Sequence, residues 1–215
     1  MAITLDPGMA KMLDEEQKLF DDFLRDLDVG EKDLASKAVA YIDSRARMFG
    51  AHLMRAGLTD RPFTIERNFE SASAAEWSQV ALSLEPELKE RLDELTFEGI
   101  GEALPLPDAC VDIFLSHGTM PGADRKEGED VTSVSPYIVV AFDETMRVLK
   151  PGAEARLFPL TRAAFGEMLE WRTAIVEQLE RLRGMGHEVS VNEAARTKGP
   201  DGVEVIHDRI ILRKR

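Results

Sequence analysis

The chain has 215 residues, 44% of them hydrophobic and 31% charged, which is an ordinary composition for a soluble globular protein. Its net charge of −13 makes it repel the phosphate backbone of nucleic acids, and its single cysteine, Cys110, excludes an internal disulfide and a thiolate metal cluster. No apolar run is long enough to cross a bilayer, and the N-terminal residues carry acids where a secretory signal is basic. We therefore expect a cytoplasmic protein that binds neither a membrane nor nucleic acid.

Two helices are predicted within the first 60 residues. From Asp14 to Asp28, apolar residues recur at helical spacing among many acids, and after Gly30 a longer helix is predicted from Glu31 to about Arg55. These helices are expected to cover one side of a sheet; alternatively, the acidic helix docks into a groove of a partner protein. The chain then divides into an N-terminal helical extension, residues 1–60, and an α/β domain, residues 61–215.

Short apolar runs alternate with helical segments along the rest of the chain. Strands are predicted at residues 63–65, 80–84, 97–103, 111–116 and 155–160, and helices at 73–79, 86–95, 135–150 and 161–183. This alternation implies parallel strands joined by right-handed crossovers. The last two apolar runs, 188–194 and 203–212, flank the turn sequence Lys198-Gly199-Pro200-Asp201-Gly202 and predict a hairpin.

Three segments in the middle of the chain carry a family resemblance. They are Ala103-Leu104-Pro105-Leu106-Pro107-Asp108, then Val111-Asp112-Ile113-Phe114-Leu115-Ser116, and then Glu144-Thr145-Met146-Arg147-Val148-Leu149-Lys150-Pro151-Gly152. In this order and at about this spacing they resemble "aLPfpd", "fDlvls" and "E..RVLKPGG" of class I S-adenosylmethionine (SAM) dependent methyltransferases. The resemblance implies a Rossmann-like, seven-stranded, mostly parallel α/β sheet with a C-terminal antiparallel hairpin. The segments mark the fold, and we interpret Glu144, Arg147 and Lys150 as surface or helix-end charges.

The same resemblance implies how SAM would be held at the carboxyl ends of the strands. It requires a glycine-rich turn after the first strand, an acid that ends the second, and a polar group after the third. With the first strand at 63–65, the turn from Ile65 to Ser73 contains no glycine, the ribose position falls on Ser83, and the third position falls on Ile100. Another register would make Glu66, Glu85 or Glu102 the acid. If SAM binds, the candidate cofactor-binding residues are Glu66, Asn68, Ser71, Ser83, Glu85 and Glu102.

These departures predict that SAM binding is lost, because each buried polar group left unpaired costs about 1 to 3 kcal/mol. We therefore expect a methyltransferase-like protein that is degenerate at the cofactor site and acts as a noncatalytic subunit or scaffold with another protein. One alternative is an active methyltransferase with a divergent site. Another is a protein that binds a different small molecule in the same cleft.

Other chemistry depends on a few scattered residues. His117 directly follows a predicted strand, where catalytic groups occur in such sheets, and is the candidate general base; otherwise it is an ordinary loop residue. The four histidines lack the spacing of a helical metal pair, so no metal site is expected. Residues 118–134 form a polar insertion that suits either a lid or a partner-binding loop. The basic residues near the C-terminus are interpreted as the solvated edge of the hairpin, the alternative being a local nucleic-acid patch.

Overall fold

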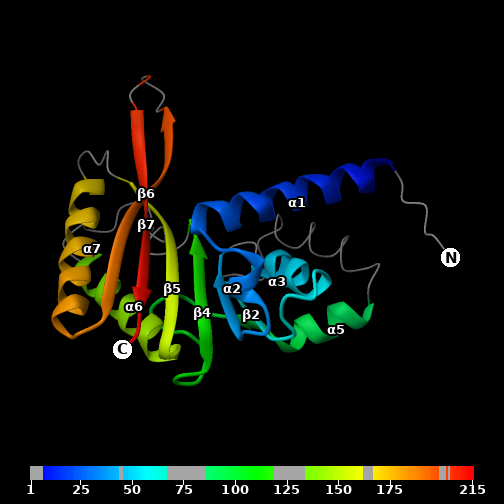
Figure 1. Ribbon diagram of the computed structural model, residues 1–215, viewed down its shortest axis with the longest axis horizontal. Helices are drawn as coiled ribbons and strands as arrows, with labels where there is room; N and C mark the ends of the chain where they lie inside the picture. Colours follow the sequence, from blue (N-terminus) through cyan, green and yellow to red (C-terminus); the bar gives the residue numbers. More distant parts are fainter. Residues whose placement is uncertain are drawn as a thin grey trace.

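A computed structural model describes residues 7–43, 46–66, 86–118, 134–161, 167–198, 202 and 204–215. Its centre is a seven-stranded sheet in the order β3-β2-β1-β4-β5-β7-β6 (Figure 1). The strands are β1 (Val39–Ile42), β2 (Pro62–Glu66), β3 (Thr96–Glu98), β4 (Val111–His117), β5 (Leu149–Thr161), β6 (Glu188–Lys198) and β7 (Glu204–Arg213). The helices are α1 (Pro7–Leu27), α2 (Glu31–Leu34), α3 (Ala46–Arg55), α5 (Pro86–Glu94), α6 (Val134–Val148) and α7 (Glu167–Gly184).

Strand direction confirms the predicted fold class. β1 to β5 pair in parallel, whereas β7 is antiparallel to both β5 and β6. The predicted C-terminal hairpin is therefore confirmed, with its first strand, β6, longer than expected. Within the described part of the chain, no helix has the length and apolarity that a membrane span needs.

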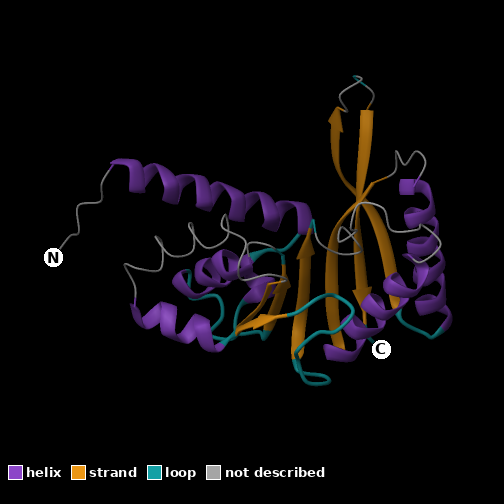
Figure 2. Cartoon of the chain, turned by 180° about the vertical axis from the view of Figure 1, so that it is seen from behind, coloured by secondary structure: helices purple, strands orange, loops and turns teal. Residues whose placement is uncertain are grey.

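Helices cover both faces of the sheet (Figure 2). Alternate residues of a strand point to opposite sides and so enter different clusters. On one face, Tyr41 and Leu115 pack with α1 and α3. On the other face, Ile42 and Phe114 pack with α6 and α7. Because the central strands are buried on both sides, they are almost continuously apolar, as expected of parallel strands.

The predicted helix from Glu31 to Arg55 is wrong. The segment forms the short helix α2, the strand β1 and the helix α3, and β1 lies in the middle of the sheet between β2 and β4. All four residues of β1 are buried, so pairing on both sides outweighs the apparent helical spacing. The predicted strand at 63–65 is therefore the second strand of the sheet and not the first. The expected domain boundary at residue 60 falls after the first strand and helix of the sheet.

Later elements lie close to their predicted positions, with two differences. β3 ends at Glu98, although a strand was predicted as far as Ala103. The helix predicted at 135–150 ends at Val148, and β5, predicted at 155–160, begins directly after it at Leu149, with Gly152 at a positive φ of 80° within the strand. The predicted helix at 73–79 and strand at 80–84 lie outside the described residues.

The segments that carry the family resemblance form a structural clamp. Arg147 donates hydrogen bonds to both carboxylate oxygens of Glu144 at 2.8 Å, to Asp108 at 2.7 Å, and to the carbonyl oxygens of Leu106 at 2.8 Å and Leu104 at 3.0 Å. The hydrogen bonds to Glu144 and Asp108 raise the pKa of Arg147. This Arg147 clamp fixes the loop between β3 and β4 to α6. The predicted structural role of these charges is consistent with this geometry.

Candidate site at the carboxyl edge

The ends of the parallel strands meet at one side of the sheet, which we call the carboxyl edge: the ends of β1, β2, β3 and β4 at Ile42, Glu66, Glu98 and His117. In the sheet register, Ile42 pairs with Ile65 on one side and with Ser116 on the other. The end of β1 therefore lies between the end of β2 and the end of β4. Ligands of open α/β sheets bind at such an edge.

The turn between β1 and α3 has the sequence Asp43-Ser44-Arg45, of which only Asp43 is described. The hydroxyl of Tyr41 donates to Asp43 Oδ2 at 2.9 Å, and the Asp43 carbonyl accepts the Ala46 amide at 3.2 Å. The glycine-free turn predicted at Ile65–Ser73 was assigned to the wrong strand. The turn that does follow the first strand also contains no glycine.

Glu66 is the acid that ends the second strand, the position that the sequence alignment gave to Ser83. Only 5% of Glu66 is exposed, and its Oε1 accepts the backbone N–H of Arg47 at 3.1 Å. Because Arg47 lies in the first turn of α3, the carboxylate is at the positive end of the helix dipole. Burial raises the pKa of Glu66 and Asp43 adds to this, while the Arg47 hydrogen bond and charge oppose it.

The end of β3 offers less polar chemistry. The Gly99 amide donates to the carbonyl of Glu66 at 3.0 Å, and Ile100 is 39% exposed. Glu102 lies half-buried in the turn beyond it. The other predicted cofactor-binding residues, Asn68, Ser71, Ser83 and Glu85, lie outside the described residues.

His117, the predicted general base, contacts the N-terminal helix. Its Nε2 lies 3.1 Å from Asp26 Oδ2, with 20% of the His117 side chain and 16% of the Asp26 side chain exposed. The imidazole stacks on Phe23 at a centroid distance of 4.3 Å and lies 5.1 Å from the ring of Phe158. A carboxylate in this position orients an imidazole. The pair therefore suits acid–base chemistry or the attachment of α1, and the sequence offered no signal for this contact.

Two arginines hold the last turn of α1 against the sheet. Arg209 of β7 donates to the carbonyl oxygens of Asp26 at 3.2 Å and Arg25 at 3.4 Å, and Arg156 of β5 donates to that of Leu27 at 3.4 Å. Cations at a helix C-terminus stabilise it through the dipole. Burial lowers the pKa of Arg209, and the charge of Asp28 partly opposes this.

Metal and nucleic-acid sites find little support in this geometry. The described residues contain no group of three or more His, Cys, Asp or Glu side chains that could hold a metal ion. Most of the basic residues near the C-terminus have protein partners: Arg196 with Glu193, Arg209 with Asp26, Arg213 with Glu154, Lys214 with Leu149, and Arg215 with Glu188. This pairing favours a structural role for these charges.

No protein-family model and no curated protein matches the sequence. Solved structures do match. An O-methyltransferase from Bacillus cereus in complex with SAH is 11% identical, with a TM-score of 0.51 and coverage of 100% of this chain and 94% of that chain. A SAM-dependent methyltransferase from Methanosarcina mazei is 14% identical, with a TM-score of 0.51 and coverage of 99% of both chains.

A third similar structure comes from a complex between the Haloferax volcanii Trm112 methyltransferase activator and a candidate methyltransferase. It is 14% identical, with a TM-score of 0.52 and coverage of 98% of this chain and 99% of that chain. At these identities the likeness establishes the fold. The chain has the class I SAM-dependent methyltransferase fold, as its sequence motifs predict.

Proposed function

We propose that this protein is a noncatalytic member of its fold class, with a SAM site that no longer binds SAM, and that it acts as a subunit or scaffold for another protein. The observation that carries the proposal is the pair of carboxyl groups at the start of α3. Asp43 stands in the turn where the fold's SAM-binding members have glycine, and Glu66 accepts the first-turn N–H of Arg47. The amide that would face a ligand's anion is thus already bonded to a protein carboxylate.

Charge supports the same conclusion. The methionine part of SAM ends in a carboxylate, which would lie beside Asp43 in the turn after β1, and like charges at a shared site repel. Bound SAM would have polar groups without partners at two places, the turn after β1 and the apolar Ile100. Each place would cost about 1 to 3 kcal/mol of binding free energy. Together they would weaken binding by a factor of about 30 to about 10⁴. Micromolar binding of SAM would not survive such a loss.

A protein partner suits this proposal, because a molecule without its own chemistry acts through its surface. One neighbouring structure is a complex with a methyltransferase activator, so the fold accommodates such a partner. The net charge of −13 favours a partner with a basic surface.

An active methyltransferase is the second candidate, and one observation favours it. Glu66 ends β2 where an acid would bind ribose, and the His117–Asp26 pair lies two strands away at the end of β4. In that case SAM and its acceptor would meet over β1, and His117 would accept the acceptor's proton. His117→Ala would then abolish methyl transfer while leaving SAM binding intact.

Thermal denaturation with SAM, with SAH, the demethylated product, and with a panel of nucleotides distinguishes the two candidates. The proposal predicts that neither SAM nor SAH raises the melting temperature of the wild type. The double variant Asp43→Asn with Glu66→Gln has neither carboxylate. It should bind SAH better than the wild type does, or, like the wild type, not bind it. Stabilisation of the wild type by SAH that disappears in Glu66→Gln would overturn the proposal, because Glu66 would then be a ligand for ribose.

A further inference from the structure

We infer that α1 is a strap, by which we mean a helix that lies across the carboxyl edge and covers the strand ends. The contact between Asp26 and His117, which we call the clasp, holds this helix in place. This inference is independent of whether SAM binds. Figure 1 and Figure 2 both show α1 running along the side of the molecule toward which β4 points. The helix thus lies where a ligand or partner would approach the strand ends.

Two side chains of α1 converge on one ring of the sheet. Phe23 and Asp26 are three residues apart and therefore share a helix face. Phe23 stacks on His117 at 4.3 Å, and Asp26 Oδ2 lies 3.1 Å from its Nε2. His117 is therefore held by a ring contact and by a carboxylate within hydrogen-bond distance, both supplied by the strap.

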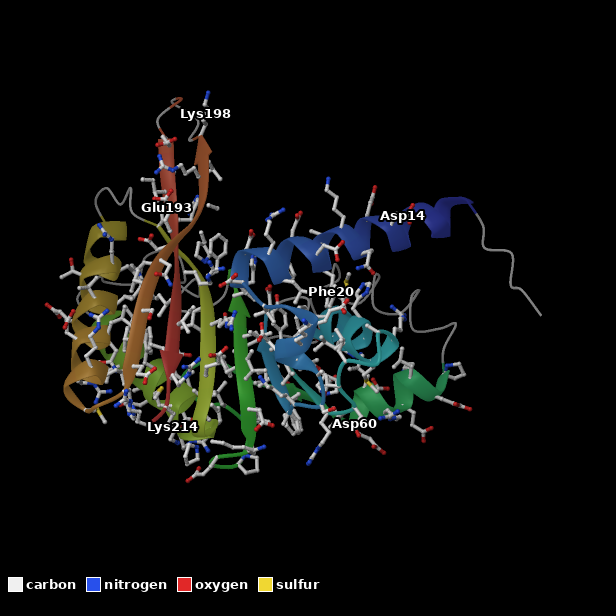
Figure 3. The ribbon with its side chains drawn as sticks, in the orientation of Figure 1. Asp14, Phe20, Asp60, Glu193, Lys198 and Lys214 are labelled. Carbon is white, nitrogen blue, oxygen red and sulfur yellow. The ribbon has the colours of Figure 1, made fainter. Side chains whose placement is uncertain are left out.

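The strap is attached mainly through its last two turns. Leu27 is fully buried, and Phe20 packs on Phe49 of α3 at a centroid distance of 5.1 Å (Figure 3). Arg156 and Arg209 bind the carbonyl oxygens at its end. By contrast, Asp14, Glu15, Gln17 and Lys18 are exposed. The attached end is the C-terminal one, where the Val29 amide also bonds to the Leu24 carbonyl at 2.8 Å.

Phe23 also connects the clasp to the turn after β1. Its ring lies 6.3 Å from that of Tyr41, whose hydroxyl donates to Asp43. A molecule that reaches the ends of β1 and β4 from this side must displace Phe23 and Asp26. The carboxyl edge is therefore accessible only when the strap has moved away from it. A molecule that binds the exposed edge shifts the equilibrium toward this open state.

Hydrogen–deuterium exchange on the full chain tests the clasp without any ligand. In Asp26→Asn, amides of residues 14–27 should exchange at least about tenfold faster than in the wild type, which corresponds to about 1.4 kcal/mol of lost protection. The amides of β4 and β5 should keep their wild-type rates. Asparagine removes a negative charge from the C-terminal end of a helix, which by itself favours the helix. Asp26 also pairs with Arg25 of the same helix at 3.2 Å. Faster exchange therefore reports the lost contact with His117 when removal of the other partner of Arg25, Asp22, leaves the exchange unchanged.

Asp22→Asn is the matched control, because Asp22 lies one turn earlier and, within the described part of the chain, forms its ion pair with Arg25 of the same helix. It should leave the exchange of α1 unchanged, whereas Phe23→Ala should reproduce the effect of Asp26→Asn. Wild-type exchange of α1 in Asp26→Asn would overturn the inference. Equal acceleration in α1, β4 and β5 would also overturn it, because Asp26 would then support the whole fold and not a separate strap.

Discussion

Glu66 is a buried carboxyl group, and this has a consequence for stability. Its pKa in the folded protein is raised by burial above the value of about 4.3 for an unperturbed glutamate. At a pH below the pKa of Glu66 in the unfolded protein, the carboxyl group is protonated in both the folded and the unfolded state. It then does not lower the free energy of unfolding. As the pH rises through the folded pKa, the folded state has to ionise a buried group, and stability is lost. Glu66 therefore destabilises the protein at neutral pH relative to acid.

Glu66→Gln should remove this cost and keep the hydrogen bond from Arg47, because the amide oxygen remains an acceptor. In urea denaturation between about pH 4 and about pH 8, the variant should gain stability relative to the wild type as the pH rises. Glu188→Gln should show the opposite sign, since the hydrogen bond from Arg215 lowers the pKa of Glu188. A constant difference between Glu66→Gln and the wild type would contradict the account.

Arg147 should matter more to folding than an ordinary surface arginine. Arg147→Ala leaves the Leu104 and Leu106 carbonyl oxygens without the hydrogen bonds they accept from it, and we expect a loss of about 2 to 3 kcal/mol in the free energy of unfolding. Arg196 is the control, because it pairs with Glu193 and Glu204 but lies 52% exposed. Arg196→Ala should cost much less than Arg147→Ala, because exposed ion pairs contribute little to stability. Equal losses in chemical denaturation would show that the Arg147 clamp has no special role.

At the scale of elements, α3 packs closely on β2 and α5 because Gly50 has no side chain. A Cβ at Gly50 would lie 2.5 Å from Thr64 Cγ2 and 2.9 Å from Leu92 Cδ1. Gly50→Ala should therefore destabilise the protein by about 1 to 3 kcal/mol, despite the better helix propensity of alanine. Gly184→Ala, at the end of α7 with nothing within 4 Å, should be neutral or stabilising. Thermal denaturation of both variants checks this, and a stabilised Gly50→Ala would contradict the packing.

The sequence predicts most of these elements because their signals are local. The run from Val111 to Ser116 and the two runs that flank Lys198–Gly202 have no competing interpretation, and the predicted strand and the antiparallel hairpin pairing are both confirmed. The segment from Leu34 to Leu53 misleads because its apolar residues fit a helix, while Val39–Ile42 becomes a strand only through pairing with β2 and β4. That error moved the cofactor positions by one strand, and only the alternative register included Glu66.

The clasp could not be predicted from local patterns. Asp26 and His117 are 91 residues apart, and their contact depends on where α1 crosses the sheet. His117 was identified from its place after a strand, but its partner was not. Contacts between distant elements depend on tertiary packing, which the period of apolar residues does not encode.

At the scale of the whole molecule, the sheet is of the methyltransferase type and carries acidic groups at its carboxyl edge. We infer that α1 lies across this edge. Calorimetric titration of the wild-type protein with SAM tests this account most directly. We predict no saturable heat at SAM concentrations up to about 1 mM, which corresponds to a binding free energy weaker than about −4 kcal/mol. Stoichiometric binding at micromolar concentration would contradict the account, since Asp43 and Glu66 would then accommodate the cofactor.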